Sequence, residues 1–279
     1  MQLADIRIYP VKSTTGVGVD AATVEPWGLD GDRRWAVVAE NGQIHSAREV
    51  PRMLSVTATP APGGAVRLTA PGLPPIEVAP PVGGTPAPLR ITRLDQATAA
   101  GEEAHRWMTR ALGLPSLLLW LEDPLRRAVG RSHGGRPGDT LTLQDTGPLL
   151  LTSGSSLRRL DDWIAEGAVE RGEEIPEPLS ALRFRPNVMI EGAEPFAEDA
   201  WTRVRIGEVE FRVGEHCDRC TLTTVDPVTT VKGKEPIRTL ARHRKWDGKT
   251  WFGIRLIPDG RGEIRVGDAV TPLDASGHR

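Results

Sequence analysis

The chain has 279 residues, a formal net charge of -2 at pH 7 and two cysteines. Its length allows one large domain or two modest ones, and the nearly balanced charge gives no electrostatic reason to expect binding to nucleic acid or to a membrane. Two cysteines are too few for a disulfide framework, and no apolar run approaches the ~20 residues that span a bilayer. No secretory signal follows Met1, so we expect a cytoplasmic protein with reduced thiols.

Alternating apolar and polar residues predict short strands in the first part of the chain. In residues 3–11, Ile6 and Ile8 alternate with charged residues, which is the period of a half-buried strand. Asn41 and Gly42 predict a two-residue type I′ hairpin turn, because that turn needs positive φ at both central residues. Further strands are expected at 22–26, 33–39, 43–47, 54–59, 65–69, 75–79, 89–94 and 116–121.

One helix is expected in this first region. Apolar residues recur on one face over 98–112, and Gly113 and Pro115 end the pattern. Residues 80–88 are rich in Pro and Gly and predict an exposed loop. The first region therefore reads as an all-β unit with one helix attached.

The second region returns mostly to strands. Ser153 or Ser155 is a suitable N-cap for a helix, and the Glu-rich segment 166–178 predicts a solvated loop, or alternatively a mobile flap over a site. Turns are predicted at Asp145, before Gly-Pro, and at 259–260. Strands are expected at 140–144, 149–152, 188–190, 203–206, 209–213, 221–225, 253–257 and 263–266. No Gly-rich phosphate-binding sequence occurs, which argues against nicotinamide or ATP as the main cofactor.

The two cysteines, Cys217 and Cys220, are the strongest candidates for chemistry, because a thiolate is both a soft metal ligand and a nucleophile. A structural zinc site needs a second pair of ligands, and the remaining histidines, His278 included, show no paired spacing. A thioredoxin-type site needs a helix at the first cysteine, whereas residues 221–225 favour a strand. Two interpretations stay open: buried unreactive thiols, or one thiolate that completes the coordination of a metal carried by a cofactor.

A second group of candidates is cationic or polar and lies in loops next to expected strands. Lys12 and Ser13 follow a strand, Arg33 enters one, and Arg185 and Asn187 precede one. Each alone is more often surface charge or part of a turn. Together they would suit an anionic ligand such as a phosphorylated pterin, because arginine offers phosphate a bidentate fork and lysine a point charge.

Several stretches carry a resemblance to a known family. They are Tyr-Pro-Val-Lys-Ser (9–13), Gly-Leu-Asp-Gly-Asp-Arg-Arg-Trp (28–35), Phe-Arg-Pro-Asn (184–187), Cys-Asp-Arg-Cys-Thr-Leu-Thr-Thr-Val-Asp-Pro (217–227) and Val-Gly-Asp (266–268). In this order they resemble the MOSC proteins, especially the mitochondrial amidoxime-reducing branch and its bacterial relatives. The stretch around the cysteines is the most specific of them.

The resemblance implies a mainly β (α+β) fold: an N-terminal MOSC β-barrel domain over 1–118 and a β-barrel-like MOSC domain over 119–279 with a few peripheral helices. It implies molybdenum cofactor (molybdopterin) between them, with Cys220 as the catalytic residue and molybdenum ligand. Arg255 stands where the mitochondrial proteins carry a Tyr. The cofactor-binding residues implied are Lys12, Ser13, Arg33, Ser153, Ser156, Arg185, Asn187, Arg219 and Arg255.

The implied activity is two-electron reduction of small N-hydroxylated compounds, such as amidoximes and hydroxylamines. The chain has no cysteines for an iron–sulfur domain, so we expect electrons from a separate flavin reductase, ferredoxin or cytochrome-type protein. Three alternatives remain: a non-catalytic molybdenum-cofactor or sulfur carrier, a zinc-stabilised β module, and a pyridoxal phosphate protein with an imine on Lys12.

Overall fold

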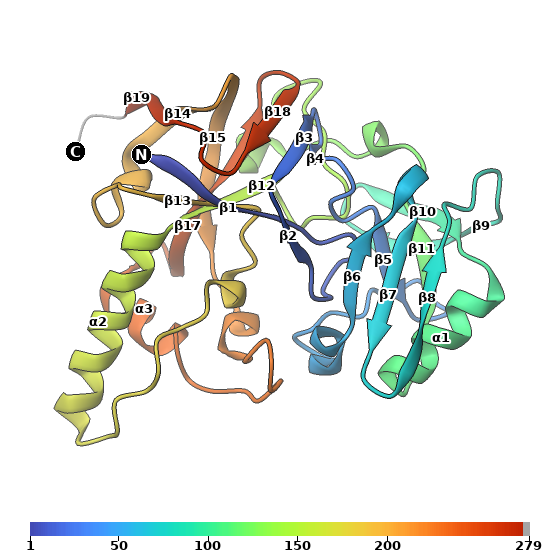
Figure 1. The fold of residues 1–279 in the computed structure, drawn as a ribbon, viewed down its shortest axis with the longest axis horizontal. Coiled ribbons are helices and arrows are strands. Elements are labelled where there is room, and N and C mark those ends of the chain that lie inside the picture. Colours follow the sequence, from blue (N-terminus) through green and yellow to red (C-terminus); the bar gives the residue numbers. More distant parts are fainter. Residues whose placement is uncertain (276–279) are drawn as a thin grey trace.

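Strands make up most of the regular structure in the computed structural model, which describes residues 1–275 (Figure 1). The mainly β fold class is thereby confirmed. Three α-helices occur in these residues: α1 (Glu102–Leu112), α2 (Gly154–Arg171) and α3 (Ile237–His243). None of the helices in this part of the chain has the length and apolar character needed to cross a membrane. His278 lies outside the described residues.

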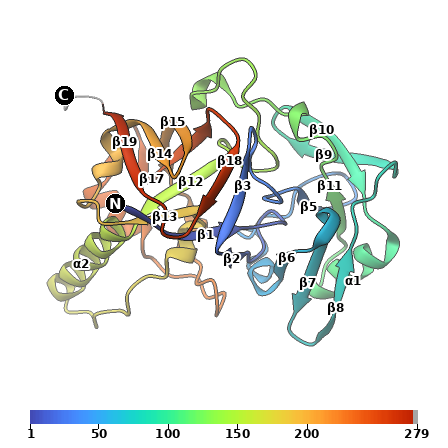
Figure 2. The same ribbon diagram turned by 45° about the horizontal axis from the view of Figure 1, so that its top comes forward.

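The larger half of the molecule is built on one nine-stranded sheet, whose strands lie side by side in Figure 2. Its order is β19-β14-β15-β17-β12-β13-β1-β2, with β16 paired to β17. The bounds are β1 (Gln2–Ile8), β2 (Val17–Val19), β12 (Leu149–Ser153), β13 (Val188–Glu191), β14 (Trp201–Ile206), β15 (Val209–Asp218), β16 (Lys245–Trp246), β17 (Lys249–Pro258) and β19 (Val270–Ala275). Only the β12–β13 pair in this sheet is parallel.

The smaller half is barrel-like and carries α1 (Figure 1). One sheet has the order β5-β11-β10-β9, and the other has β6-β7-β8. Their bounds are β5 (Trp35–Val38), β6 (Thr57–Pro60), β7 (Val66–Ala70), β8 (Leu73–Val78), β9 (Pro86–Ile91), β10 (Leu94–Ala99) and β11 (Leu117–Trp120). Trp107 and Met108 of α1 pack with both sheets in one buried apolar cluster, as the helical periodicity predicts.

The start of the chain belongs structurally to the larger half. β1 pairs with β13, and the alternation predicted around Ile6 and Ile8 is confirmed, since both lie in the core of the large sheet. A small sheet of β3 (Ala21–Glu25), β4 (Gly28–Leu29) and β18 (Gly262–Arg265) likewise pairs a segment from the first part of the chain with one from its C-terminal part. The boundary between 118 and 119 remains a prediction, because strands from both sides of it share one sheet.

The strand predicted over 221–225 is wrong in a way that matters for the site. Residues Thr221–Thr224 form a 3₁₀ turn that begins at Cys220. The hydroxyl of Thr223 donates to the carbonyl of Cys220, and that of Thr224 donates to the carbonyl of Thr221. These local bonds compete with strand pairing, which is why β-branched residues here do not continue β15.

The segment 140–144 was also expected to be a strand and is not. Leu141 and Leu143 are buried, so the alternation is real, but the pairing of this segment among the described residues is limited to an isolated bridge between Thr140 and Ala128. Instead, Arg127 Nη1 donates to the carbonyls of Thr142 and Gln144, at 2.6 Å each. A buried arginine thus satisfies backbone acceptors that a sheet would otherwise satisfy.

Two further differences concern where the helices α1 and α2 begin and end. The predicted helix over 98–112 begins only at Glu102, because β10 occupies 94–99 between its neighbours β9 and β11. The loop predicted over 166–178 is helical up to Arg171, where Gly172 caps α2 at φ 66°. Glu170, near the end of α2, forms an ion pair with Arg242 of α3. This ion pair connects the acidic segment to α3.

The turn predictions were partly wrong. Only Gly42 has positive φ, and the Asn41 side chain accepts from the Gln43 backbone, so the turn is not type I′. The strand predicted over 43–47 is reduced to two isolated bridges, one between Ile44 and Val38 and one between Gln43 and Arg90. The turn at 259–260 does not close a hairpin, since β18 pairs with β3 rather than with β17.

Gly253, two residues before Arg255, is a glycine that the sheet requires. Its φ is 78°, and an added Cβ would lie 2.6 Å from the carbonyl oxygen of Leu151 in the adjacent strand. We predict that Gly253→Ala lowers the free energy of unfolding by about 3 kcal/mol or more, from backbone strain plus a clash with backbone. Urea unfolding checks this, with Gly260→Ala as control, since that position has open space around it. Equal stability of the two variants would contradict the prediction.

Candidate functional site

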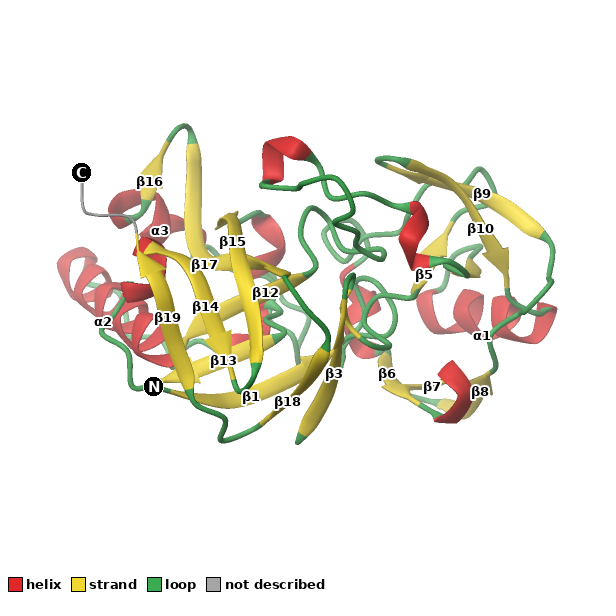
Figure 3. Cartoon of the chain, turned by 90° about the horizontal axis from the view of Figure 1, so that it is seen from above, coloured by secondary structure: helices red, strands yellow, loops and turns green. Residues whose placement is uncertain are grey.

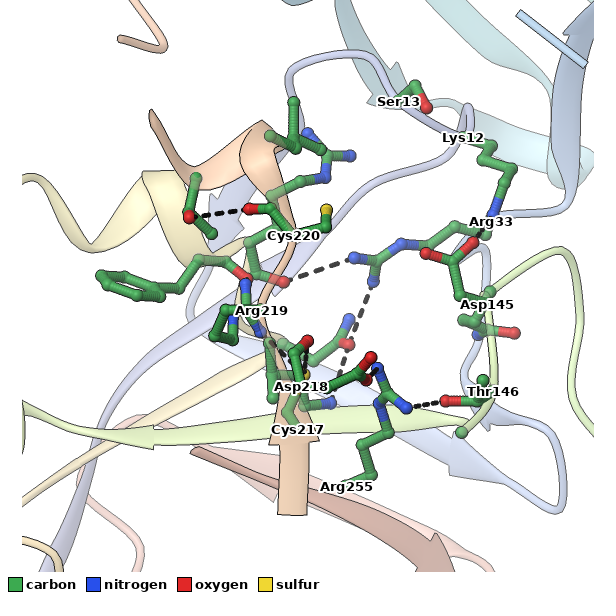
Figure 4. Close-up of a pocket in the computed structure, with 18 of the residues that line it drawn as sticks. Lys12, Ser13, Arg33, Asp145, Thr146, Cys217, Asp218, Arg219, Cys220 and Arg255 are labelled. Atoms are coloured by element: carbon green, nitrogen blue, oxygen red, sulfur yellow. Dashed lines mark hydrogen bonds and ion pairs between the residues drawn. The ribbon is translucent and has the colours of Figure 1, made fainter. Parts of the chain in front are cut away.

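A polar pocket opens at one end of the large sheet, where five adjacent strands contribute residues. Figure 4 shows ten of its lining residues labelled. The residues after β1 and β15 and those before β12 and β13 meet here, and β17 contributes from its middle. The lining residues are Lys12, Ser13, Arg33, Ser46, Arg48, Gln144, Asp145, Thr146, Gly147, Leu149, Leu150, Arg183, Phe184, Arg185, Asn187, Cys217, Asp218, Arg219, Cys220, Leu222, Thr223 and Arg255. Eight of the ten predicted site residues are among them.

The two cysteines lie in different environments. Cys220 is exposed and lines the pocket, on the opposite side from Lys12 and Arg33 (Figure 4). Cys217 is only 3% exposed, and its Sγ accepts a hydrogen bond from Arg219 Nη1 at 2.7 Å. Cys220 is therefore accessible to a ligand in the pocket, whereas Cys217 is already engaged by protein.

Arg185 is a largely buried cation without an anionic partner in the described structure. Its Nη2 has no hydrogen-bond partner, and its guanidinium lies 4.4 Å from the centroid of the Tyr9 ring. Burial and then the nearby Arg33 lower the pKa of Arg185 to about 10. A buried unpaired charge is costly, so this side chain favours an anion in the pocket.

Lys12 and Asp145 form an ion pair across the pocket rim, and Lys12 Nζ also donates to the carbonyl of Leu143 at 2.8 Å. Burial lowers the pKa of Lys12, while Asp145 opposes that shift. The charge of Lys12 in turn holds the pKa of Asp145 below its ordinary value. The Asp145 side chain is 79% exposed, so water screens this pair and an incoming anion can compete for Lys12.

The side chains of Arg33 and Asn187 are hydrogen-bonded to each other and to the surrounding protein. Arg33 Nη1 donates to Asp32 Oδ2 at 2.6 Å and to Asn187 Oδ1 at 3.0 Å. Asn187 also accepts from the Leu150 backbone and donates to the carbonyl of Arg7. Its amide group is thus occupied by protein, and its evident role is to hold Arg33 at the pocket.

Arg255 is held by carboxylates on the neighbouring strand β15. It pairs with Glu215 and with Asp218, the latter at 3.2 Å, and it donates to the hydroxyl of Thr146. Burial lowers its pKa, but Cys217, Glu215 and Asp218 together outweigh burial and raise it. Arg255 therefore lies at the pocket with its charge balanced by Glu215 and Asp218, and these contacts fix the position of its side chain.

Three of the seven non-glycine residues with positive φ among residues 1–275 line this pocket. Ser13, Arg33 and Arg185 are non-glycine residues with φ of 68°, 45° and 56°. Such conformations cost of order 1–3 kcal/mol each and persist only where surrounding contacts enforce them. All three residues line the same pocket, which indicates that the local chain is shaped to aim these side chains.

Two predicted residues lie elsewhere. Ser153, the last residue of β12 and the N-cap position of α2, is buried, and its Oγ is 2.7 Å from the Oγ of Ser155. Ser156 contacts both carboxylate oxygens of buried Glu198 and accepts from the Phe196 backbone. Their polar groups are satisfied inside the protein, and the structure does not bring either residue to the pocket.

Sequence reasoning missed the acidic and hydroxyl groups of the pocket. Asp145 was expected only in a turn, yet it pairs with Lys12, and Thr146 next to it contacts Arg255. Asp218 and Glu215 likewise hold Arg255. Asp145 precedes β12 as Arg185 precedes β13, and the starts of parallel neighbours meet at one end of the sheet. That parallel pairing was the missing signal.

The chain is similar in sequence to known protein families. Residues 1–115 match the model described as the MOSC N-terminal beta barrel domain, and residues 138–271 match the MOSC domain. The chain is 33% identical to mitochondrial amidoxime-reducing component 1 of Homo sapiens over 96% of this chain and 82% of that protein. It is 29% identical to molybdenum cofactor sulfurase of Oryza sativa subsp. japonica over 98% of this chain and 35% of that protein. The crystal structure of the YUAD protein from Bacillus subtilis, 12% identical, has a TM-score of 0.41 and covers 96% of this chain and 93% of its own.

Glu198 gives this half of the protein a pH-dependent stability. Burial raises its pKa from 4.5 to about 7, despite the hydrogen bond from Ser156. The protonated form is favoured in the folded state, so its stabilising contribution is complete below pH 4.5 and is lost as pH rises to 7. We predict that the wild type loses roughly 3 kcal/mol over this range relative to Glu198→Gln.

Urea unfolding at several pH values measures this loss. The control is Glu208→Gln, at an exposed position on the same half of the molecule. Parallel pH profiles for the wild type and Glu198→Gln would contradict the assignment.

Proposed function

The chain belongs to the MOSC-domain proteins, and from this premise we propose that it binds molybdenum cofactor and reduces N-hydroxylated compounds. The observation that carries the proposal is an exposed thiol, Cys220, in the same pocket as Arg185, a cation that lacks an anionic partner among the described residues. A cofactor with a metal at one end and a phosphate at the other matches that pairing of a soft ligand with surplus positive charge.

The side chains present fit such a group. The Nε of Arg183, the Nη2 of Arg185 and the Nε of Arg219 are buried without a hydrogen-bond partner in the described structure. They are donors that a phosphate and a polar pterin would satisfy. No group of three or more His, Cys, Asp or Glu residues within 1–275 is arranged to hold a metal ion. A metal brought by the cofactor needs only one protein thiolate.

In this proposal Cys220 ligates molybdenum, and Lys12, Ser13, Arg185 and Arg219 bind the phosphate and pterin. Arg33 is positioned by Asp32 and Asn187, and Arg255 by Glu215 and Asp218. When bound, the cofactor supplies two-electron redox chemistry at the N–O bond. The protein contributes orientation and a fixed electrostatic environment, because its cations are held in place before the ligand arrives.

A second candidate function is that of a cofactor or sulfur carrier without turnover. The exposure of Cys220 favours it, because an accessible thiol can accept sulfur, and the relatives include proteins named molybdenum cofactor sulfurase. Pyridoxal phosphate receives less support. An imine would need a free amine at Lys12, whose ammonium is engaged by Asp145 and by the carbonyl of Leu143.

We predict that Cys220→Ser, purified from a host that makes molybdenum cofactor, loses nearly all bound molybdenum. Cys217→Ser should retain it, because serine can still accept the hydrogen bond from Arg219. Metal analysis and quantification of released pterin measure both. Zinc without pterin, or equal loss in the two variants, would refute the role of Cys220.

The wild-type preparation then separates the two functions. Turnover of benzamidoxime with a chemical reductant is the result expected of a reductase, and it should vanish with Cys220→Ser. A fully loaded protein without turnover would favour the carrier.

Arg185 offers an independent prediction. Arg185→Gln removes a charge-assisted bond to the ligand, so retention of pterin should fall about 10- to 100-fold. The unloaded variant should be at least as stable as the wild type, because a buried unpaired cation has been removed. Pterin quantification and urea unfolding give the two readouts, with exposed Arg67→Gln as control. Unchanged pterin retention would argue against an anion at Arg185.

A further inference from the structure

The lysines of this protein are concentrated near the pocket. The chain has 30 arginines but only five lysines, and four of these lie within residues 232–249. Lys232, Lys234, Lys245 and Lys249 are all exposed, and none of them forms an ion pair with a residue in 1–275. Arginines of the same segment are mostly paired, as Arg238 is with Glu235. The lysines thus present unneutralised charge to solvent.

Hydrogen bonds place these lysines on both sides of the segment that carries Cys220. On one side, the Arg219 backbone donates to the carbonyl of Thr250, which follows Lys249. On the other side, Lys232 forms an isolated antiparallel β-bridge with Val225, and the backbone N–H of Gly233 donates to the carbonyl of Thr224. The two basic stretches therefore flank the Cys220 segment directly, with α3 joining them. Figure 3 shows the β16–β17 hairpin projecting from the sheet beside α3.

Exposed apolar side chains lie among the lysines. Val228 is 84% exposed, Val231 66% and Trp246 38%. Trp246 stacks on Trp251 with ring centroids 5.7 Å apart, and the ammonium of Lys249 lies 5.4 Å from the Trp251 ring. Apolar and aromatic groups within a charged surround are the usual composition of a transient protein interface. We call residues 228–249 with Trp251 the lysine face.

The charge of this face is opposite to that of the rest of the chain. Residues 227–251 contain seven Lys and Arg and two Asp and Glu, whereas the whole chain has a net charge of -2. Arg238, Arg242 and Arg244 pair with Glu173, Glu170 and Asp199 from outside this segment, so its surplus positive charge comes from the four lysines. A positive region of this kind attracts an acidic protein from solution and orients it. Its position beside Cys220 suits a partner that must come close to the metal site.

We propose that the lysine face is the docking surface for an acidic one-electron carrier protein, such as an acidic [2Fe–2S] ferredoxin. This rests on the proposed reductase function. Reduction of one hydroxylamine consumes two electrons and two protons: R–NH–OH + 2 e⁻ + 2 H⁺ → R–NH₂ + H₂O. A one-electron carrier supplies one electron at each docking and leaves oxidised, so it docks twice per turnover. Exposed lysines favour fast, salt-sensitive and reversible association of this kind.

The test uses the cofactor-loaded protein and an acidic [2Fe–2S] ferredoxin as probe. The variant Lys232→Gln/Lys234→Gln/Lys245→Gln/Lys249→Gln removes four charges and keeps a polar side chain at each position. A matched control replaces four exposed arginines elsewhere: Arg67→Gln/Arg90→Gln/Arg110→Gln/Arg205→Gln. We expect Kd for ferredoxin at low salt to rise about tenfold or more in the lysine variant and to stay within about twofold in the control. The wild-type Kd should rise with salt, and less so in the lysine variant.

Equal Kd values for the lysine variant and the wild type, or equal weakening in the control, would overturn the proposal. Loss of binding to phosphatidylserine vesicles with unchanged ferredoxin binding would overturn it in favour of a membrane. Turnover of benzamidoxime with a chemical reductant bypasses the carrier and should be the same in the wild type and the lysine variant. Absent turnover with intact, lysine-dependent ferredoxin binding would refute the reductase function while leaving the docking surface in place.

Discussion

The site depends on an incomplete balance of charge in one pocket. Four of its cations have carboxylate partners: Lys12 with Asp145, Arg33 with Asp32, Arg183 with Asp226, and Arg255 with Glu215 and Asp218. Arg185 has no such partner in the described structure, and Arg219 has only the Cys217 sulfur and a carbonyl. The paired cations can be buried without a ligand, whereas the unpaired ones create a demand for an anion.

The large sheet keeps this arrangement in place when no ligand is present. Strands β15, β17, β12, β13 and β1 are consecutive neighbours, so residues distant in sequence reach one end of the sheet. The left-handed conformations of Ser13, Arg33 and Arg185 are strained, and the surrounding ladder and hydrogen bonds must stabilise them. A ligand therefore meets side chains that are already ordered, which lowers the entropic cost of binding.

Sequence patterns predicted much of this and missed what depends on long-range pairing. The period-2 pattern of β1 and the apolar face of α1 reflect burial, which is local in sequence, and both are found. The alternation over 140–144 also reflects burial, but Arg127 replaces the neighbouring strand. The family resemblance predicted that Lys12, Arg185 and Cys220 share one site, and all three line the pocket. That Asp145 also belongs to the pocket follows only from the parallel pairing of β12 with β13. The hydroxyl of Ser156 donates to the buried carboxylate of Glu198 and does not face a ligand site.

X-ray absorption spectroscopy at the molybdenum edge of the loaded protein tests most directly whether Cys220 binds the metal. We expect a thiolate sulfur from Cys220 in the metal's coordination sphere in addition to the sulfurs of the cofactor. The spectrum of Cys217→Ser should match that of the wild type, while any molybdenum retained by Cys220→Ser should have one sulfur fewer. An unchanged sulfur count in Cys220→Ser, or a lost sulfur in Cys217→Ser, would contradict the assignment of Cys220 as the ligand.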